Sequence, residues 1–288
     1  IFQAEEKTTL QYLKDFGFSK EIITDFFTPF FSGIFLETKL ETSSRMFEFV
    51  YKMFGDGLAV IPKNGMQAIP DQLKSNLKNT TFKFNSPVKE VKDKQLLLED
   101  GSVLESNITV IATEASALVS NLKNQKTDWK SCDTLYFEAE KKVINRPLIG
   151  LITDKNTLVN NIFYHTSVAT SNKTEKELLS VTVVEKHQLN EKDLIDIVLE
   201  ELHSKCGISE VTFLKRYQIK KALPKLINLQ HEISSTETKL KSTIFLAGDQ
   251  LLNASLNAAM IAGERAAMGV IQTLEDGLIV DELTSEYS

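Results

Sequence analysis

Two near-continuous apolar runs, far apart in the chain, most constrain how it can fold. The first is "ITVIAT" at residues 108–113, and the second is "TIFLAG" at residues 243–248. Apolar, β-branched runs of this length favour central strands that are covered on both faces, as in the sheet of an α/β protein. They belong to strand–helix units at 65–115 and 243–273, and a long stretch of different character separates the units. The sequence therefore predicts one sheet built from distant segments, with a second domain inserted between them.

Helical spacing dominates the start of the chain, and mixed patterns follow it. Three short helices are expected within residues 1–57, the first ended by Gly17, and a further helix is expected from a turn at 62–65 to about Leu77. A hairpin turn is expected at Asp100-Gly101. Strands are expected at 81–85, 87–92, 95–106, 107–113, 132–138, 148–152, 159–164, 178–185, 211–219 and 243–247, and helices at 190–204 and 255–273. The final "DELTSEYS" is polar, so it is expected to fray.

Composition excludes several classes of partner. The formal net charge of −6 argues against a nucleic-acid partner. Two cysteines without a CxxC pair indicate a reducing compartment, so a cytoplasmic location is expected. The four histidines have no metal-ligand spacing, and no apolar run reaches the roughly 18 residues of a membrane-spanning helix. The chain begins without methionine, which predicts that the natural protein extends further in the N-terminal direction.

A candidate ligand site follows the second apolar run. Gly248 permits a tight corner, and Asp249 then stands at the carboxyl edge of the sheet, where open α/β folds bind ligands. Its carboxylate could accept hydrogen bonds from sugar or ribityl hydroxyls. Ser255 can cap the next helix, and its first amides are expected to stay free for a negatively charged oxygen, at Asn257, Ala258 and Ala259. Small residues along this helix predict a flat face that packs closely on a strand or a planar ring.

The residues around this site resemble a known family. "AGDQ…SLNAAMIAGERAA" is similar to the C-terminal flavin motif of the FAD-dependent amine oxidase and phytoene desaturase superfamily, with Ala258 and Ala262 in place of a glycine and a serine. "PKNGMQAIPDQL" around Gly65 and the strand series at 86–113 resemble two further segments of that family, in the same order. The resemblance implies that the backbone at Val88 contacts adenine and that the Ala112-Thr113 turn approaches FAD.

One part of the family's cofactor site has no counterpart in these residues. Members of the superfamily begin with a G-x-G-x-x-G loop that cradles the FAD diphosphate. The sole GxG here, Gly55–Gly57, ends a helix and has Val60 at the third glycine position. FAD is therefore expected in the full-length parent but weakly bound or absent in this chain, and the fragment alone is expected to be inactive.

The resemblance also implies the fold class and its domains. It implies an α/β (mixed α+β) fold in which a partial FAD/NAD(P)-binding-type domain of discontinuous segments holds an inserted substrate domain of mixed sheet and helices. The expected boundaries are substrate-domain helices at 1–60, an FAD-binding-type segment at 61–118, the substrate domain at 119–235, a C-terminal FAD-binding segment at 236–276 and a tail at 277–288.

Several functions remain open at this stage. The resemblance implies hydride transfer from an apolar carbon substrate to flavin, as in phytoene or carotenoid desaturases. Phe26, Phe27, Phe30 and Phe31 form an aromatic stripe at helical spacing. The stripe could line a tunnel for a small apolar molecule, belong to the ordinary hydrophobic core, or support peripheral membrane contact. Amine oxidases carry a lysine near flavin on the strand that matches "SCDTLYFEAE", where Cys132 or Asp133 stands here with Lys130 nearby. Amine oxidation is therefore an alternative, as is a truncated, non-catalytic module that binds an apolar ligand or a partner subunit. The oligomeric state and the catalytic residues stay open.

Overall fold

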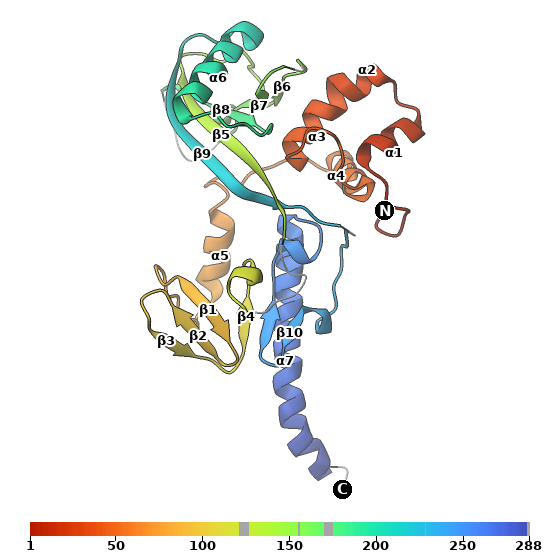
Figure 1. Cartoon of the computed structure of the whole chain (residues 1–288), viewed down its shortest axis with the longest axis vertical. Helices are drawn as coiled ribbons and strands as arrows, with labels where there is room; N and C mark the ends of the chain where they lie inside the picture. Colours follow the sequence, from red (N-terminus) through yellow and green to blue (C-terminus); the bar gives the residue numbers. More distant parts are fainter. Residues whose placement is uncertain (121–126, 155, 170–174, 228, 287–288) are drawn as a thin grey trace. The chain divides into compact units, whose positions relative to one another are not determined.

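The chain divides into two compact units, each made of segments that are distant in sequence (Figure 1). The computed structural model describes residues 1–288 except 121–126, 155, 170–174, 228 and 287–288, and for 276–286 it describes the backbone alone. The first unit contains Gln3–Thr80 and Trp129–Leu223, and the second contains Thr81–Asp128 and Pro224–Ser288. Discontinuous segments are what the two distant apolar runs predict.

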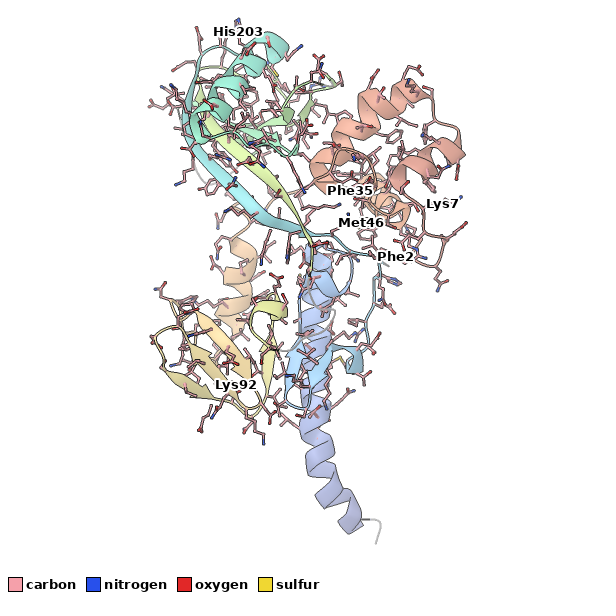
Figure 2. All side chains as sticks on the ribbon, viewed as in Figure 1. Phe2, Lys7, Phe35, Met46, Lys92 and His203 are labelled. Carbon is pink, nitrogen blue, oxygen red and sulfur yellow. The ribbon has the colours of Figure 1, made fainter. Side chains whose placement is uncertain are left out.

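The first unit begins with a series of short helices, several of which enclose an aromatic core. They are α1 (Thr9–Phe16), α2 (Lys20–Ile22), a π-helical turn (Ile23–Phe27), α3 (Thr28–Phe35), α4 (Ser44–Asp56) and α5 (Ala68–Asn76). Gly17 ends α1 with φ +95°, as predicted, and Ser19 and Ser43 accept hydrogen bonds from first-turn amides of α2 and α4. The buried core consists of Leu13, Ile23, Phe27, Phe31, Phe35, Leu40 and Phe47, and Met46 packs against it (Figure 2).

A five-stranded sheet forms the rest of the first unit. Its order is β6 (Gly150–Leu151), β7 (Val159–Tyr164), β8 (Glu177–Val183), β5 (Trp129–Ala139) and β9 (Val211–Pro224). Helix α6 (Glu191–Cys206) starts at the Asn190 cap and ends at Gly207, where φ is +67°. Alternate residues of β5, β7 and β8 are buried with one face of α6, which explains the amphipathic patterns in the sequence.

The second unit holds two three-stranded sheets. In one, β1 (Val88–Lys92), β2 (Gln95–Leu98) and β3 (Val103–Glu105) pair antiparallel, and Gly101 adopts φ +84° in the predicted β2–β3 turn. In the other, β11 (Ile244–Leu246) lies between β10 (Lys239–Lys241) and β4 (Thr109–Ile111). The chain ends in the long helix α7 (Leu256–Glu286).

Three sequence expectations differ from the structure. Residues 81–85 form no strand, although their polar and apolar residues alternate, and Phe84 is 67% exposed. Strand β4 lies at an edge of its described sheet with Val110 42% exposed, so it is not covered on both faces, whereas β11 is fully buried. Helix α7 continues to Glu286 and does not end near 273, because no proline interrupts that stretch.

Among the residues that the structure describes, no helix combines the length and the hydropathy needed to cross a bilayer.

Candidate functional site

The second unit brings together two chain segments that the sequence analysis linked to cofactor binding. Strands β4 and β11 are parallel neighbours, with Thr109 opposite Ile244 and Ile111 opposite Leu246. The Ala247 amide donates to the Ile111 carbonyl at 2.9 Å and extends the ladder by one residue. Because parallel strands end at the same edge of a sheet, the Ala112-Thr113 turn and the Gly248-Asp249 corner emerge side by side.

Gly248 makes a corner that other residues would strain. Its φ of +134° and ψ of 163° lie in a region that is nearly confined to glycine. A Cβ atom here would overlap Gln250 Oε1. The Gln250 amide group donates to the Ala247 carbonyl at 3.2 Å, which holds that side chain across the corner. The backbone conformation thus requires glycine, and a larger residue would also displace the Gln250 side chain.

Asp249 is a half-buried acid at this edge. Burial raises the pKa of its carboxyl above the ordinary value, while hydrogen bonds from the Gln250 amide and its own amide pull the pKa back. Its carbonyl accepts the amides of Leu252 and Ala254, which fixes the loop before α7. Ala254 adopts φ +61°, an uncommon conformation for a residue with a side chain. The acid therefore sits in a tightly specified loop, where it could accept hydrogen bonds from a ligand.

Fewer backbone amides are free at the start of α7 than the sequence predicted. Ser255 caps the helix as predicted, with Oγ accepting from the Ala258 amide at 3.0 Å. The Ala259 amide donates to the Ser255 carbonyl, also at 3.0 Å. These two amides are consequently occupied, so the expectation that Ala258 and Ala259 offer free donors is wrong. The amide of Asn257 has no partner within the described part of the chain.

The small residues of α7 serve close packing on β11. Ala258, Ala262 and Ala266 are almost fully buried along one helix face. Further along, a Cβ atom on Gly269 would lie 2.8 Å from the Phe245 ring. The flat face predicted from the sequence is present, and it packs against the protein's own strand and loop residues.

The remaining cofactor candidates lie in different units. Val88 opens β1 and packs against the core that Ile111 and Leu246 share, so it belongs with the parallel pair. Gly65 lies in the first unit, in a turn where φ is +82° and its amide donates to the Pro62 carbonyl. Whether any of these residues contacts a cofactor remains a prediction.

The aromatic stripe divides between core and surface. Phe27 and Phe31 are buried in the aromatic core, whereas Phe26 is 38% exposed and stacks on Phe30 with ring centroids 5.5 Å apart. Phe27 also lines an apolar pocket of about 410 Å³ together with Tyr12, Phe16, Phe18, Phe47 and Tyr51. The stripe therefore helps to build a cavity, and its role in substrate binding remains a prediction.

Sequence reasoning missed a buried ionic cluster around Asp133 of β5. Arg216 Nε on β9 donates to Asp133 Oδ1 at 2.6 Å, and His187 Nε2 lies 3.2 Å from Oδ2 without hydrogen-bond geometry. All three side chains are about nine-tenths buried. No spacing signal joins residues so distant in the chain, so the sequence alone could not have assembled them. Lys130, considered above for amine oxidation, donates to Thr42 Oγ1 at 2.7 Å.

Comparisons with known proteins extend these observations. The family model of flavin-containing amine oxidoreductases matches residues 3–271. No curated protein matches the chain in sequence. Among solved structures, an oxidoreductase from Methanosarcina mazei aligns with a TM-score of 0.69 and 13% identity, over 94% of this chain and 69% of that one.

Two further solved structures also align with the chain. A proposed protoporphyrinogen oxidase from Exiguobacterium sp. 255-15 aligns with a TM-score of 0.70 and 13% identity, over 94% of this chain and 68% of its own. A CLA-producing fatty acid isomerase from P. acnes aligns with a TM-score of 0.51 and 10% identity, over 71% of this chain and 51% of its own. At such low identities the likeness concerns the fold.

Proposed function

Because the chain belongs to the flavin-containing amine oxidoreductase family, we propose that its protein is an FAD-dependent oxidoreductase that removes a hydride from an apolar carbon substrate. The observation that carries the proposal is the parallel β4–β11 edge, where the Ala112-Thr113 turn and the Gly248-Asp249 corner emerge together. An edge of this kind is where α/β folds hold nucleotide-type cofactors.

The residues of this edge fit part of FAD. The Asp249 carboxyl is half buried, and its hydrogen bonds come from backbone amides, so it retains capacity to accept ribityl hydroxyls. Gly248 keeps the corner free of a side chain, and the Asn257 amide at the start of α7 offers a donor for a flavin oxygen. Val88, Ala112 and Thr113 would contribute backbone to the adenine and flavin sides. A glycine-rich loop for the diphosphate is not among these 288 residues.

When bound, FAD would supply the acceptor for a hydride, that is, for two electrons together with one proton. The residues described here would bind and orient it. In the first unit, aromatic side chains line most of the 410 Å³ pocket beside Phe27, Phe47 and Tyr51, together with Glu48 and Lys52, and this lining supports an apolar substrate class. The fatty acid named for the P. acnes isomerase is consistent with such a class within this fold.

Amine oxidation is the second candidate, and the family description favours it. On β5, however, the position near the expected flavin lysine is taken by Cys132, a buried thiol, or by Asp133, which is paired with Arg216. The apolar pocket therefore supports the desaturase-like alternative better. A substrate screen that compares a long-chain alkene with a primary amine, scored by flavin bleaching under argon, would separate the two candidates.

The cofactor proposal is tested by FAD titration of the purified full-length protein. Asp249→Ala should weaken FAD binding by about 10- to 100-fold, because a hydrogen bond to a charged group contributes roughly 1.5–3 kcal/mol. Glu105→Ala on β3, which removes an exposed acid from the same unit, should leave affinity unchanged. Full-length protein that takes up no FAD, while its circular dichroism shows that it is folded, would favour a non-catalytic module that binds an apolar ligand or a partner subunit.

A further inference from the structure

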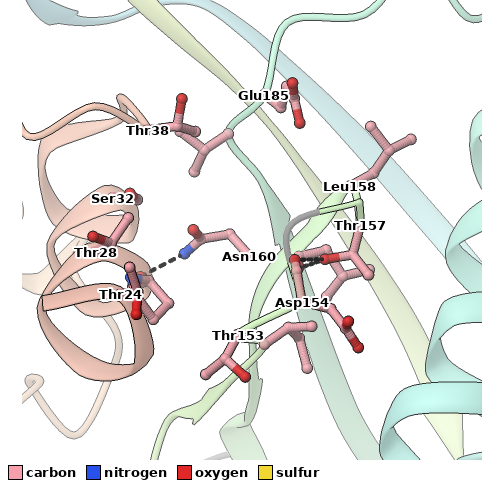
Figure 3. Close-up of a pocket in the computed structure, with 14 residues that line it drawn as sticks. Thr24, Thr28, Ser32, Thr38, Thr153, Asp154, Thr157, Leu158, Asn160 and Glu185 are labelled. Carbon is pink, nitrogen blue, oxygen red and sulfur yellow. Dashed lines mark hydrogen bonds between the residues drawn. The ribbon is translucent and has the colours of Figure 1, made fainter. Parts of the chain in front are cut away.

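A second pocket lies within the first unit, between α3 and strand β7 (Figure 3). Its volume is about 290 Å³, and it shares no residue with the cofactor candidates. Gly33 allows the close approach of helix and strand, because a Cβ atom there would stand 2.8 Å from Asn161 Oδ1. Asn160 Nδ2 donates to the Pro29 carbonyl at 3.0 Å and ties the two elements together. The pocket is therefore held by direct contacts between its walls.

Three hydroxyl groups of the pocket already donate their hydrogen within the protein. Thr28 Oγ1 donates to the Ile23 carbonyl at 2.7 Å, and Thr157 Oγ1 donates to the Asp154 carbonyl at 2.9 Å. Thr24 Oγ1 likewise donates to the Lys20 carbonyl at 3.0 Å. A hydroxyl has a single hydrogen, so each of these three offers a ligand lone pairs only.

Asn160 adds an acceptor of fixed orientation. Its Nδ2 donates to the Pro29 carbonyl and to Asn161 Oδ1, which uses both hydrogens. Its Oδ1 therefore points away from these bonds, as Figure 3 shows. An amide oxygen with two lone pairs is the complement of an N–H donor.

Ser32 provides an independent sign that the pocket takes a polar ligand. Its residue is 1% exposed, and its Oγ has no hydrogen-bond partner in the described structure. The residue lines the pocket from α3 (Figure 3). A buried hydroxyl without a partner costs about 1–3 kcal/mol unless a ligand or water satisfies it.

The charges at the rim are acidic. Glu185 and Asp154 line the pocket, and Lys205 pairs with Asp154 at 2.8 Å, so Glu185 dominates the local charge. Within the described residues, no lysine, arginine or histidine lines this pocket. An anion would therefore meet acceptors and a carboxylate with no cationic partner, which is unfavourable. Apolar walls from Pro29, Leu158 and Val159 leave room for a short carbon chain.

We propose that this pocket binds a small organic ammonium ion, whose N–H groups donate to Asn160 Oδ1 and the threonine hydroxyls while its carbon chain packs on Pro29 and Val159. Glu185 adds electrostatic attraction from the rim, and Ser32 Oγ gains its missing partner. The proposal goes beyond the flavin function and does not depend on it, because none of its residues is a cofactor candidate or lines the 410 Å³ pocket.

Calorimetric titration of the full-length protein with ethylammonium chloride tests the proposal. Tetramethylammonium has the same charge without an N–H donor and should bind at least tenfold more weakly, since charge-assisted hydrogen bonds contribute roughly 1.5–3 kcal/mol. Glycerol has donors without charge and should also bind more weakly. Equal binding of tetramethylammonium, tighter binding of glycerol, or no heat from ethylammonium would overturn the proposal.

Three variants locate the binding within the protein. Ser32→Ala should weaken ethylammonium binding by about tenfold or more, the effect of one hydrogen bond to a charged group, and Glu185→Gln by about two- to fivefold, as expected for an exposed charge. Glu200→Gln on α6 makes the same charge change outside the pocket and should have no effect. If Glu200→Gln and Glu185→Gln weaken binding equally, or if Ser32→Ala binds ethylammonium as the parent does, the ion binds elsewhere. Thermal melting confirms that each variant is folded.

Discussion

At the scale of single residues, Gly248 determines how the chain leaves β11. Gly248→Ala should destabilise the protein by about 1–3 kcal/mol, because the backbone conformation suits only glycine and the new methyl would displace Gln250 from the Ala247 carbonyl. Urea unfolding of both proteins measures the loss.

A matched substitution separates this effect from the general cost of replacing glycine. Gly55 lies inside α4, and a Cβ atom there would meet nothing within 4 Å. Gly55→Ala should therefore stabilise the protein by up to about 1 kcal/mol through helix propensity. If Gly248→Ala leaves the free energy of unfolding unchanged, the corner is not strained.

Sequence reasoning at this scale succeeded where a residue acts through its own backbone. Gly17, Gly101 and Gly248 were placed at turns by their chemistry, and all adopt positive φ. It failed for the amides of Ala258 and Ala259, because competition from the Ser255 hydroxyl and carbonyl depends on rotamer and loop geometry. The pattern of residue types does not contain that information.

At the scale of elements, Asp133 links β5 to β9 across the sheet of the first unit. Asp133→Ala should cost about 3–5 kcal/mol, since it leaves the buried Arg216 guanidinium without its carboxylate. The double variant Asp133→Ala/Arg216→Met should lose less free energy of unfolding than the sum of the losses of the two single variants, because apolar groups then replace both charges. Denaturant titrations of the four proteins complete the cycle, and additive costs would show that the two charges do not interact.

Helices and strands were predicted well where the spacing of apolar residues agreed with the capping and turn residues. The helix expected at 190–204 is α6, with Asn190 as its cap, and the strands expected at 132–138 and 159–164 are β5 and β7. Residues 81–85 alternate in the same way but form no strand, because a strand also requires a pairing partner. The periodicity of the sequence does not predict which residues meet in the tertiary structure. Examples are Arg216 with Asp133, and Asn160 with the Pro29 carbonyl.

At the scale of the whole molecule, each unit has its own hydrophobic core. Leu135 is fully buried in the core of the first unit and Ile244 in that of the second. Leu135→Ala should destabilise by about 2–5 kcal/mol and accelerate hydrogen exchange in β5, β7 and β8 more than in β4 and β11. Ile244→Ala should show the opposite distribution.

Hydrogen exchange followed by mass spectrometry resolves the two regions in one experiment. Equal acceleration in both units by either substitution would mean that the chain unfolds as one cooperative body. The overall α/β plan was predictable from the two distant apolar runs and from the family resemblance. The order of the strands was not predictable. Both β4 and β11 were expected to be central, but among the described strands only β11 lies in the middle of its sheet.

The parallel pairing of β4 with β11 also has a consequence for biosynthesis. All five strands of the first unit's sheet lie between these two strands in the chain, so every residue up to 246 must leave the ribosome before the pair can form. Closing a loop of this length costs on the order of 4 kcal/mol in chain entropy, which favours folding of the intervening segment before closure. The Asp249 edge would then be completed late, and a nascent chain that stalls before residue 244 would expose β4 as an unpaired edge to chaperones and proteases.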